Sequence, residues 1–493
     1  MLGKWTSHAD YQQFVRQNLQ RISQTDPQRV LEYQDVISKL YILNLDKLKK
    51  VIAPLYSDIG RPANFQPEIF RSFVAMMELE ETLDNWIAKL RYNEVLRTAI
   101  GVTEEDIPCA TSHYDFINRI IDMDEKPKIR LKKRKPTEKL GKNNKMPNRH
   151  QGIVQRLVDK ILCGRRFKKR PERHLQQIFT DVCVASSREL GIIPDSVDVS
   201  GDGTCVETGA SHYGRKICDC NEFGCDCPRK FSDPNATWGW DSHNERYFYG
   251  YTGYFLSTYN RELKADIPLY LRLVEAKRND SVSAVVALSE FRDLCPDLTI
   301  NSFIHDKACD NYPTYELLHA WNINAIIPLS DNNTGNFKYP PSLSLDEHGV
   351  PVCPGGNKMV YWGFCNDRCR LKWRCPRACG KCEPCDACGN CSPSAYGRVI
   401  YTKPDWDLRL FTKIPRGSDA WKELMKTRTS IERINDRILI DYGIEDAKTR
   451  GKKRISFAVT IAAVNIHLDI QLKLLSTRGD FDFNHLFINS KAA

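Results

Sequence analysis

The chain has 493 residues, 41% of them hydrophobic, and a formal net charge of +10 at pH 7. This hydrophobic content excludes an intrinsically disordered chain, and the length indicates two to four domains. No run of about 18 uninterrupted apolar residues marks a membrane-spanning helix. The first residues lack the apolar core of a signal peptide, so we expect a soluble, cytoplasmic protein without a membrane partner.

Apolar residues recur at helical spacing through most of residues 1–125. The pattern predicts helices over 11–22, 30–55 and 69–79, and further helices that begin near Thr82 and Ser112. We interpret this segment either as a helical accessory domain or as a helix-turn-helix-like module for DNA binding or dimerisation.

Positive charge is concentrated between Lys126 and Arg173, where 19 Lys and Arg residues stand against three acids. The segment carries +16, so the rest of the chain sums to −6. This contrast favours a nucleic-acid partner over a merely solvated linker. Residues 126–194 are predicted to form a flexible lysine-rich linker followed, over 153–190, by basic helices. The candidate DNA contacts are Lys132, Lys133, Arg134, Lys135, Arg165, Arg166, Lys168, Lys169 and Arg170.

Strand and helix patterns alternate over residues 195–329, which predicts the first part of an α/β domain with some parallel pairing. Residues 330–415 interrupt the alternation, and residues 416–493 resume it as the C-terminal part of the same domain. The expected strands cover 197–202, 247–251, 269–274, 298–305 and 325–329, and the expected helices cover 281–294, 312–321, 421–439 and 455–475.

Three acids occupy positions suited to a shared site. Asp202 ends a predicted strand and precedes Gly203, whose freedom lets the carboxylate stand clear, and Asp306 ends the strand over 298–305. Glu432 follows Arg428 by four residues, so the two share one face of a helix. The plainer alternatives are an Asp-Gly turn and a surface ion pair.

Three carboxylates can hold two Mg²⁺ or Mn²⁺ ions about 3.5–4 Å apart. Hard divalent ions prefer oxygen ligands, so Asp and Glu are the fitting residue types and the abundant cysteines are not. The three acids therefore predict metal-assisted phosphoryl transfer.

The order of these motifs resembles the DDE transposases of bacterial insertion sequences. It reads Asp202-Gly203-Thr204, then Asp306-x3-Asp310-Asn311, then Arg428-x3-Glu432. The segments Trp238-Gly239-Trp240-Asp241, Tyr249-Gly250-Tyr251 and Ala276-Lys277-Arg278-Asn279-Asp280-Ser281 are also similar. The resemblance covers most of the chain apart from the cysteine segments. It implies a ribonuclease H-like α/β catalytic core, with a mixed sheet flanked by helices, preceded by an all-α domain.

By this resemblance Asp202, Asp306 and Glu432 form the metal-binding triad, and Arg428 contacts DNA near the cleavage point. The implied partner is double-stranded DNA, both transposon ends and target, bound by a homodimer at the nucleoid. Family members often carry Tyr three residues before the Arg and Lys seven after the Glu. Here those positions are Met425 and Leu439, so Arg437 is our candidate for the basic contact.

Most of the 19 cysteines fall in two clusters. In a reducing compartment clustered cysteines are typical of metal ligands rather than disulfides. Eight thiolates in the insertion over 330–415 suit two tetrahedral Zn²⁺ sites, and the small cluster over 218–227 suits a third; an iron–sulfur centre is the alternative. The predicted ligands are Cys218, Cys220, Cys225, Cys227, Cys365, Cys369, Cys375, Cys379, Cys382, Cys385, Cys388 and Cys391.

The leading hypothesis is a DNA transposase that cuts its element's ends and transfers the freed strand to target DNA. The alternative is a zinc-dependent DNA-binding regulator derived from an inactive transposase. A stand-alone endonuclease is a third possibility, which joining of donor and target DNA would exclude. His243 and His305 are interpreted as ordinary hydrogen-bond partners.

Overall fold

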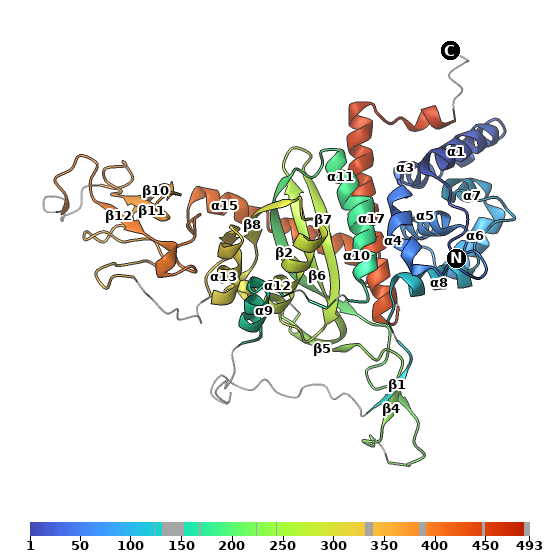
Figure 1. The fold of residues 1–493 in the computed structure, drawn as a ribbon, viewed down its shortest axis with the longest axis horizontal. Helices are drawn as coiled ribbons and strands as arrows, with labels where there is room; N and C mark the ends of the chain where they lie inside the picture. The colour runs from blue at the N-terminus through green and yellow to red at the C-terminus, as the bar shows by residue number, and fades with distance from the viewer. Residues whose placement is uncertain are drawn as a thin grey trace.

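The computed structural model describes residues 1–123, 125–130, 152–165, 167–168, 170–222, 224–242, 244–330, 339–383, 391–445 and 449–487. At its centre lies a six-stranded mixed sheet with helices on both faces (Figure 1). This confirms the predicted α/β class.

The sheet runs in the order β5–β6–β2–β8–β9, with β7 beside the second half of β6. Pairing is parallel between β2 and β8 and between β8 and β9, and antiparallel elsewhere. Most residues of the two long antiparallel strands, β6 and β7, are buried, so these strands lie in the core. The bounds are β2 Ser196–Glu207, β5 Thr237–Asp241, β6 Arg246–Asn260, β7 Ala265–Glu275, β8 Thr299–Ile304 and β9 Asn324–Ile326.

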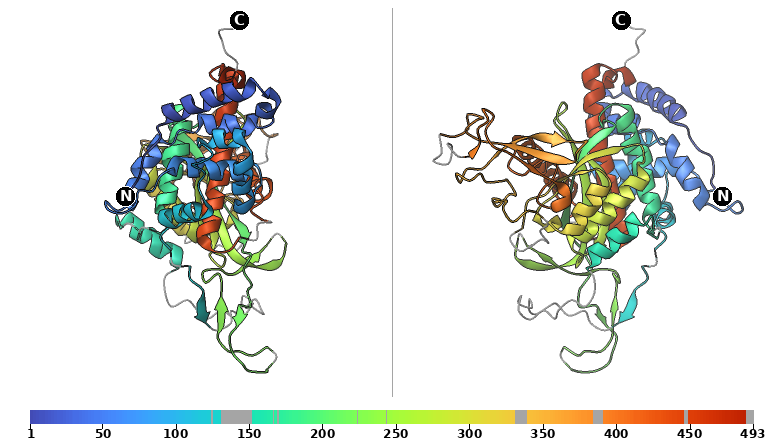
Figure 2. Two further views of the ribbon diagram at one scale, coloured as in Figure 1. Left: turned by 90° about the vertical axis from the view of Figure 1, so that its right-hand side faces the viewer. Right: turned by 60° about the vertical axis from the view of Figure 1, so that its left-hand side comes forward.

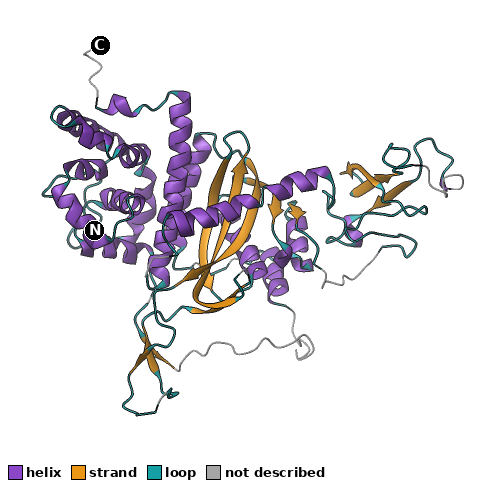
Figure 3. Ribbon diagram, turned by 180° about the vertical axis from the view of Figure 1, so that it is seen from behind, coloured by secondary structure: helices purple, strands orange, loops and turns teal. Residues whose placement is uncertain are grey.

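Two sets of helices cover the two faces of this sheet. Side chains alternate between faces along a strand, so Ser200 and Gly203 of β2 face opposite sides. Ser200 meets Thr427, next to α16 (Thr429–Asp436), whereas the Gly203 side meets α12 (Asp280–Leu294). The α12 side also carries α9 (Ile153–Leu162) and α13 (Tyr312–Ala320), and Figure 3 shows the sheet from the other side.

The long helix α17 (Lys452–Arg478) packs against β7 and against the N-terminal helices α3, α5 and α8. It is long and apolar enough to cross a membrane, but 83% of its most apolar window is buried in the protein, as expected of a core helix. Some of its polar side chains form hydrogen bonds inside the protein. Asn465 donates to the Val74 carbonyl, and the two His467 ring nitrogens bond Ser187 and the Pro268 carbonyl.

Residues 8–120 contain only helices among the described elements, and their core is continuous with that of the sheet through α17. The single run expected over 30–55 is instead three short helices. The chain turns extended at Leu43, and the Asn44 side chain accepts the Asp46 N–H at 2.9 Å, which ends one helix and starts the next. The bounds are α1 His8–Ser23, α2 Pro27–Leu31, α3 Gln34–Ile42, α4 Asp46–Ile52, α5 Gln66–Glu78, α6 Leu83–Tyr92, α7 Glu94–Ile100 and α8 Ala110–Ile120.

The cysteine-rich insertion, residues 330–415, projects from the body beside α13 and α15 (Figures 1 and 2). Its sheet joins β10 (Val360–Cys365), β11 (Arg370–Arg374) and β12 (Val399–Thr402) around a small apolar core of its own. The chain returns to the body through α15 (Asp419–Lys426). The expected helix over 421–439 is broken, since α15 ends before Thr427 and a π-helical turn, η6 (Arg437–Asp441), follows α16.

A second, smaller projection is a three-stranded antiparallel ribbon below the body (Figure 1). It joins β1 (Lys128–Arg130), β4 (Arg229–Phe231) and β3 (Arg215–Lys216). The loop between β3 and β4 carries the small cysteine cluster.

Candidate active site

Asp202 lies within β2 rather than at its end. The strand was expected to stop there, but antiparallel pairing with β6 carries it on to Glu207. The parallel pairing with β8, in contrast, ends at Ser200 opposite Ile304. Asp202 therefore stands just beyond the end of the parallel part of the sheet.

Asp202 and Asp306 each stand two residues beyond the last registered pair of β2 and β8, Ser200 and Ile304. Residues at equal distances past a parallel pair lie at the same level of a sheet. The backbone of Asp306 is extended, so it continues the direction of its strand. Two of the three predicted acids thus meet at one edge.

The surroundings of Asp202 make its carboxylate costly to ionise. Burial raises the pKa of Asp202 to about 6, the charge of His305 lowers it, and the charges of Asp280 and Asp306 raise it further. The backbone N–H of Gly203 donates to Asp202 Oδ1 at 2.9 Å. Negative charge is thus concentrated at this edge.

His305 fixes the orientation of Asp306. The imidazole is fully buried, and its Nδ1 lies 2.6 Å from Asp306 Oδ1, which also accepts the Ala308 N–H at 2.9 Å. Burial alone would raise the pKa of Asp306, but the hydrogen bond and charge of His305, the Ala308 N–H and the charge of Arg428 together lower it. Its side chain remains 44% exposed, so the carboxylate is both ionised and accessible.

Asp280 is a fourth carboxylate that the sequence analysis did not single out. It begins α12, and a Cβ atom placed on Gly203 would lie 2.3 Å from Asp280 Oδ1. Gly203 is therefore required by this close approach, whereas the sequence suggested that its backbone freedom lets the Asp202 carboxylate stand clear. Two signals were available in the sequence: Asp280 belongs to the family-like segment over 276–281, and it is an acid in the first turn of a helix that directly follows a strand.

The helix α16 begins over the same strands. Ser200 Oγ donates to the Thr427 carbonyl at 3.4 Å, and Ser430 Oγ lies 3.3 Å from Ser257 Oγ of β6. Ile431 and Ile434 are fully buried beneath the helix, which leaves Glu432 at its side.

Arg428 and Glu432 form an ion pair one turn apart on this helix, as their spacing predicts. The same Arg428 charge contributes to the lowered pKa of Asp306. The Glu432 side chain itself is 42% exposed. Arg428 therefore interacts with both acids: it forms an ion pair with Glu432, and its charge acts on Asp306.

Two further residues of the resembling motifs are structural. Asp310 is fully buried and accepts both Arg409 Nε at 2.8 Å and Arg409 Nη2 at 2.7 Å. Asn311 caps α13 through the Thr314 N–H. The motif around Asp306 therefore anchors the returning end of the insertion as well as the acidic edge.

Residues 352–468 match a family model described as a transposase DDE domain. The match supports a DDE transposase. Arg428 and Glu432 lie inside the matched range, whereas Asp202 and Asp306 lie before it. No curated protein matches the chain.

The predicted DNA contacts of this transposase-like chain fall in different environments. Arg437 pairs with Asp469 of α17 at 2.8 Å. The contacts over 165–170 were expected on a helix, but α9 stops at Leu162 because Gly164 turns left-handed and the Arg165 N–H bonds back to Lys160. The candidates outside the described residues are Lys132, Lys133, Arg134, Lys135, Arg166 and Lys169.

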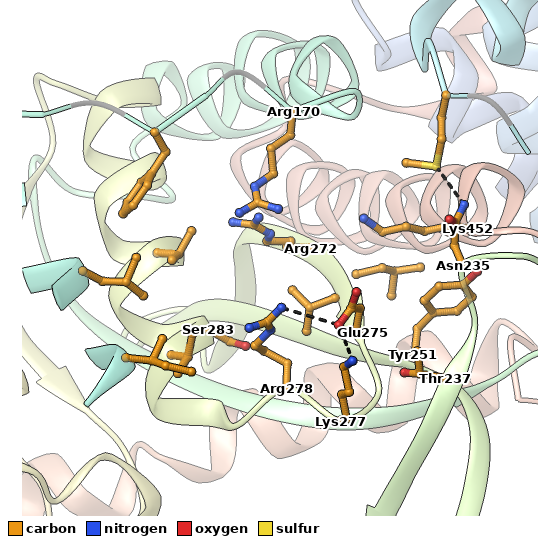
Figure 4. Close-up of a pocket in the computed structure, with 18 of the residues that line it drawn as sticks. Arg170, Asn235, Thr237, Tyr251, Arg272, Glu275, Lys277, Arg278, Ser283 and Lys452 are labelled. Carbon is orange, nitrogen blue, oxygen red and sulfur yellow. Dashed lines mark hydrogen bonds and ion pairs between the residues drawn. The ribbon is translucent and has the colours of Figure 1, made fainter. Parts of the chain in front are cut away.

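Arg170 lines a cavity of about 720 Å³ between α12, β7 and the start of α17 (Figure 4). The basic side chains around this cavity form ion pairs with glutamates. Arg170 and Arg272 lie 3.5 and 3.0 Å from Glu290, and Lys277 and Arg278 each lie 3.5 Å from Glu275. Lys452 is ion-paired with Glu172. Five cations thus share three acids, so this wall keeps an excess of two positive charges.

The four cysteines over 218–227 come together as predicted. Their sulfur atoms all lie within 4.8 Å of one another, an arrangement that could hold a metal ion. Hydrogen bonds among these thiols lower the pKa of Cys225 and raise the pKa of Cys220, so their protonation is shared within the cluster.

The cysteines of the large insertion give a different result. Cys385 and Cys388 lie outside the described residues. No three of the remaining ones gather as a metal-binding group in the ranges that the structure covers, so two zinc sites stay a prediction there. The described members are Cys365, Cys369, Cys375, Cys379, Cys382 and Cys391.

Proposed function

We propose that the protein is a DNA transposase that cleaves transposon ends and joins the freed strands to target DNA. The observation that carries the proposal is the register of β2 and β8, which brings Asp202 and Asp306 to one edge beside the helix of Glu432. The transposase DDE match over residues 352–468 supports the same reaction class. The strand order β7–β6–β2–β8–β9 supports a ribonuclease H-like core.

The acidic edge fits hard divalent cations. All its donors are carboxylate oxygens. Burial, and after it the charges of Asp280 and Asp306, raise the pKa of Asp202, and a bound cation would relieve this repulsion. Asp202, Asp306 and Glu432 would hold two Mg²⁺ or Mn²⁺ ions. When bound, these ions activate the attacking oxygen and neutralise the leaving one.

The surrounding residues prepare these ligands. His305 and the Ala308 N–H lower the pKa of Asp306 and fix its Oδ1, which leaves Oδ2 available as a ligand. The Gly203 N–H holds Asp202 Oδ1. Arg428, one turn before Glu432, supplies positive charge for the phosphate at the cleavage point.

In the proposed reaction a water oxygen attacks the phosphorus at the transposon end, and the 3′ oxygen leaves as a hydroxyl. That hydroxyl then attacks a target phosphorus in line, and a target 3′ oxygen leaves. Each step exchanges one P–O bond for another, so no residue of the chain forms a covalent intermediate.

We assign Zn²⁺ to the four-cysteine cluster. The sulfur separations of 3.3, 3.6 and 3.7 Å approach the roughly 3.8 Å edge of a tetrahedron with Zn–S bonds of about 2.3 Å. This spacing favours one tetrahedral ion over an iron–sulfur cluster, whose thiolates bind separate irons. Metal analysis of the purified protein would separate the two.

We also propose a homodimer on DNA, since two ends need two active sites, with the N-terminal helices contributing to DNA binding or dimerisation. An origin in a bacterial insertion sequence and a place at the nucleoid follow from the same proposal.

The test is a cleavage assay on duplexes copied from the DNA that flanks the coding region. We expect Mg²⁺-dependent nicks at an inverted repeat and, with added target, joined products. Asp202→Asn, Asp306→Asn and Glu432→Gln should abolish both while DNA binding persists. Asp198→Asn, on the same strand, is the matched control. Tight binding without any product under Mg²⁺ or Mn²⁺ would instead indicate a DNA-binding regulator.

A further inference from the structure

The ribbon formed by β1, β4 and β3 carries closely spaced Lys and Arg side chains, and the loop that joins β3 to β4 also holds Asp219, Glu222 and Asp226. In register, Ile129, Lys230 and Arg215 form one cross-strand row, and Arg229 faces Lys216 in the next. Lys128, Lys230, Arg215 and Lys216 are exposed. Among the residues that the structure describes, Lys128, Lys230 and Arg215 form no ion pair.

This arrangement is unfavourable for an isolated ribbon. Lys230 lies directly opposite Arg215, and Arg229 directly opposite Lys216. Like charges directly opposite on adjacent strands destabilise the pairing of those strands. Two such pairs in a ribbon with little apolar core require an external source of stability.

The cysteine cluster supplies one such source. It occupies the loop that joins β3 to β4, and a tetrathiolate metal site there would close the ribbon covalently at its tip. Lys216 Nζ donates a hydrogen bond to the Cys220 carbonyl, and the Arg229 side chain donates one to the Cys225 sulfur. Lys216 and Arg229 thus interact with the cysteine cluster, whereas Lys230 and Arg215 form no ion pair with any residue that the structure describes.

We propose that this ribbon is a metal-stapled arm that binds the phosphate backbone of duplex DNA. Side chains repeat about every 6.6 Å along each strand and about every 4.8 Å across strands, so the ribbon offers a grid of cations to an extended polyanion. The choice of DNA as the polyanion rests on the proposed function. Binding by the arm needs none of the three acids of the catalytic site.

The test measures the affinity of the full-length protein for a random-sequence duplex by fluorescence anisotropy between 50 and 200 mM KCl. No Mg²⁺ and no chelator are added, so cleavage cannot contribute and the cysteine-bound metal stays in place. The double variant Arg215→Ala/Lys230→Ala removes the free cations. Lys422→Ala/Lys473→Ala, two exposed cations on α15 and α17, changes the net charge equally.

Two lost phosphate contacts should reduce the slope of log K against log [salt] by about 1.8. The affinity of the wild type should therefore fall about tenfold more than that of Arg215→Ala/Lys230→Ala over this range, and the control should follow the wild type. Cys218→Ser/Cys225→Ser should reproduce the loss with unchanged unfolding of the body, and combining it with Arg215→Ala/Lys230→Ala should add nothing.

An unchanged slope in Arg215→Ala/Lys230→Ala would overturn the proposal. So would a loss of binding to phosphatidylserine vesicles with unchanged DNA affinity, which would make the arm a membrane contact. Because the readout is binding without divalent ions, failure of the arm and failure of the transposase reaction give different results. If the wild type failed to cleave DNA but Arg215→Ala/Lys230→Ala still reduced the slope of log K against log [salt] by about 1.8, DNA binding by the arm would stand without the transposase reaction.

Discussion

Arg428 forms an ion pair with Glu432 one turn along α16, while its charge also lowers the pKa of Asp306. One cation thus pairs with Glu432 and acts electrostatically on Asp306, two of the three proposed metal ligands. In the proposed metal site Glu432 would exchange this partner for a divalent ion, and the Arg428 charge would oppose that exchange.

The ion pair predicts that Arg428→Gln binds Mn²⁺ more tightly than the wild type in the absence of DNA, because Glu432 is released and local positive charge is removed. A few-fold gain, measured by electron paramagnetic resonance titration of free Mn²⁺, is expected. DNA cleavage should still fall, since the phosphate loses its cation. Arg433→Gln, whose partner is Asp266 on β7, is the matched control and should change neither. Weaker Mn²⁺ binding by Arg428→Gln would contradict this account.

Asp202 should cost the metal-free protein stability. Its pKa is raised from 3.8 to about 6, so the folded state favours the protonated form. Protonated Asp202 therefore makes its full contribution to the free energy of unfolding below pH 3.8, and this contribution is lost as the pH rises through about 6. At pH 7.5 Asp202→Asn should therefore raise the free energy of unfolding by about 1–3 kcal/mol while abolishing cleavage. Denaturant unfolding checks this, with Asp198→Asn as control. Destabilisation by Asp202→Asn would be the contrary result.

The same pKa sets the pH dependence of metal binding. A protonated Asp202 is a poor ligand, so the affinity for Mn²⁺ should rise with pH and level off above about 6. Because the charge of Asp280 raises the pKa of Asp202, Asp280→Asn should move this midpoint to lower pH. Isothermal titration calorimetry across pH 5–8 measures both. An unshifted midpoint in Asp280→Asn would show that the two carboxylates are not coupled.

Much of the fold was predictable because it depends on local pattern. The helix α12, the strand β8 and the helix α13 begin and end within about two residues of the expected positions, since Asn279 and Asn311 cap their helices in the usual way. The basic stretch over 165–170 was misassigned, because Gly164 ends α9 although helical spacing continues.

The site was predictable in part. Asp202, Asp306 and Glu432 could be chosen by order and spacing, and the four-cysteine cluster by spacing alone. Asp280 could not, since only the tertiary approach of α12 to Gly203 brings it near. The structural role of Asp310 also depends on a partner, Arg409, that lies 99 residues away.

The buried pair of Asp310 and Arg409 should hold the insertion to the body. The exposed fractions of the two side chains are 0% and 6%, so Arg409→Met would leave a buried carboxylate without its cation. A loss of about 3–5 kcal/mol in the free energy of unfolding is expected, with faster proteolysis over 403–418. Arg433→Gln breaks a more exposed pair and should cost less than about 1 kcal/mol. Equal losses in the two variants would argue against this anchoring role.

The most direct test of the proposed catalytic centre is a change of metal preference. Asp306→Cys and Glu432→Cys replace a hard oxygen with a softer sulfur, so cleavage of the flanking-DNA duplex should be lost with Mg²⁺ and partly restored with Mn²⁺. Asp198→Cys should cleave normally with both ions. Full Mg²⁺-dependent cleavage by Asp306→Cys and Glu432→Cys would contradict the assignment of these acids as metal ligands.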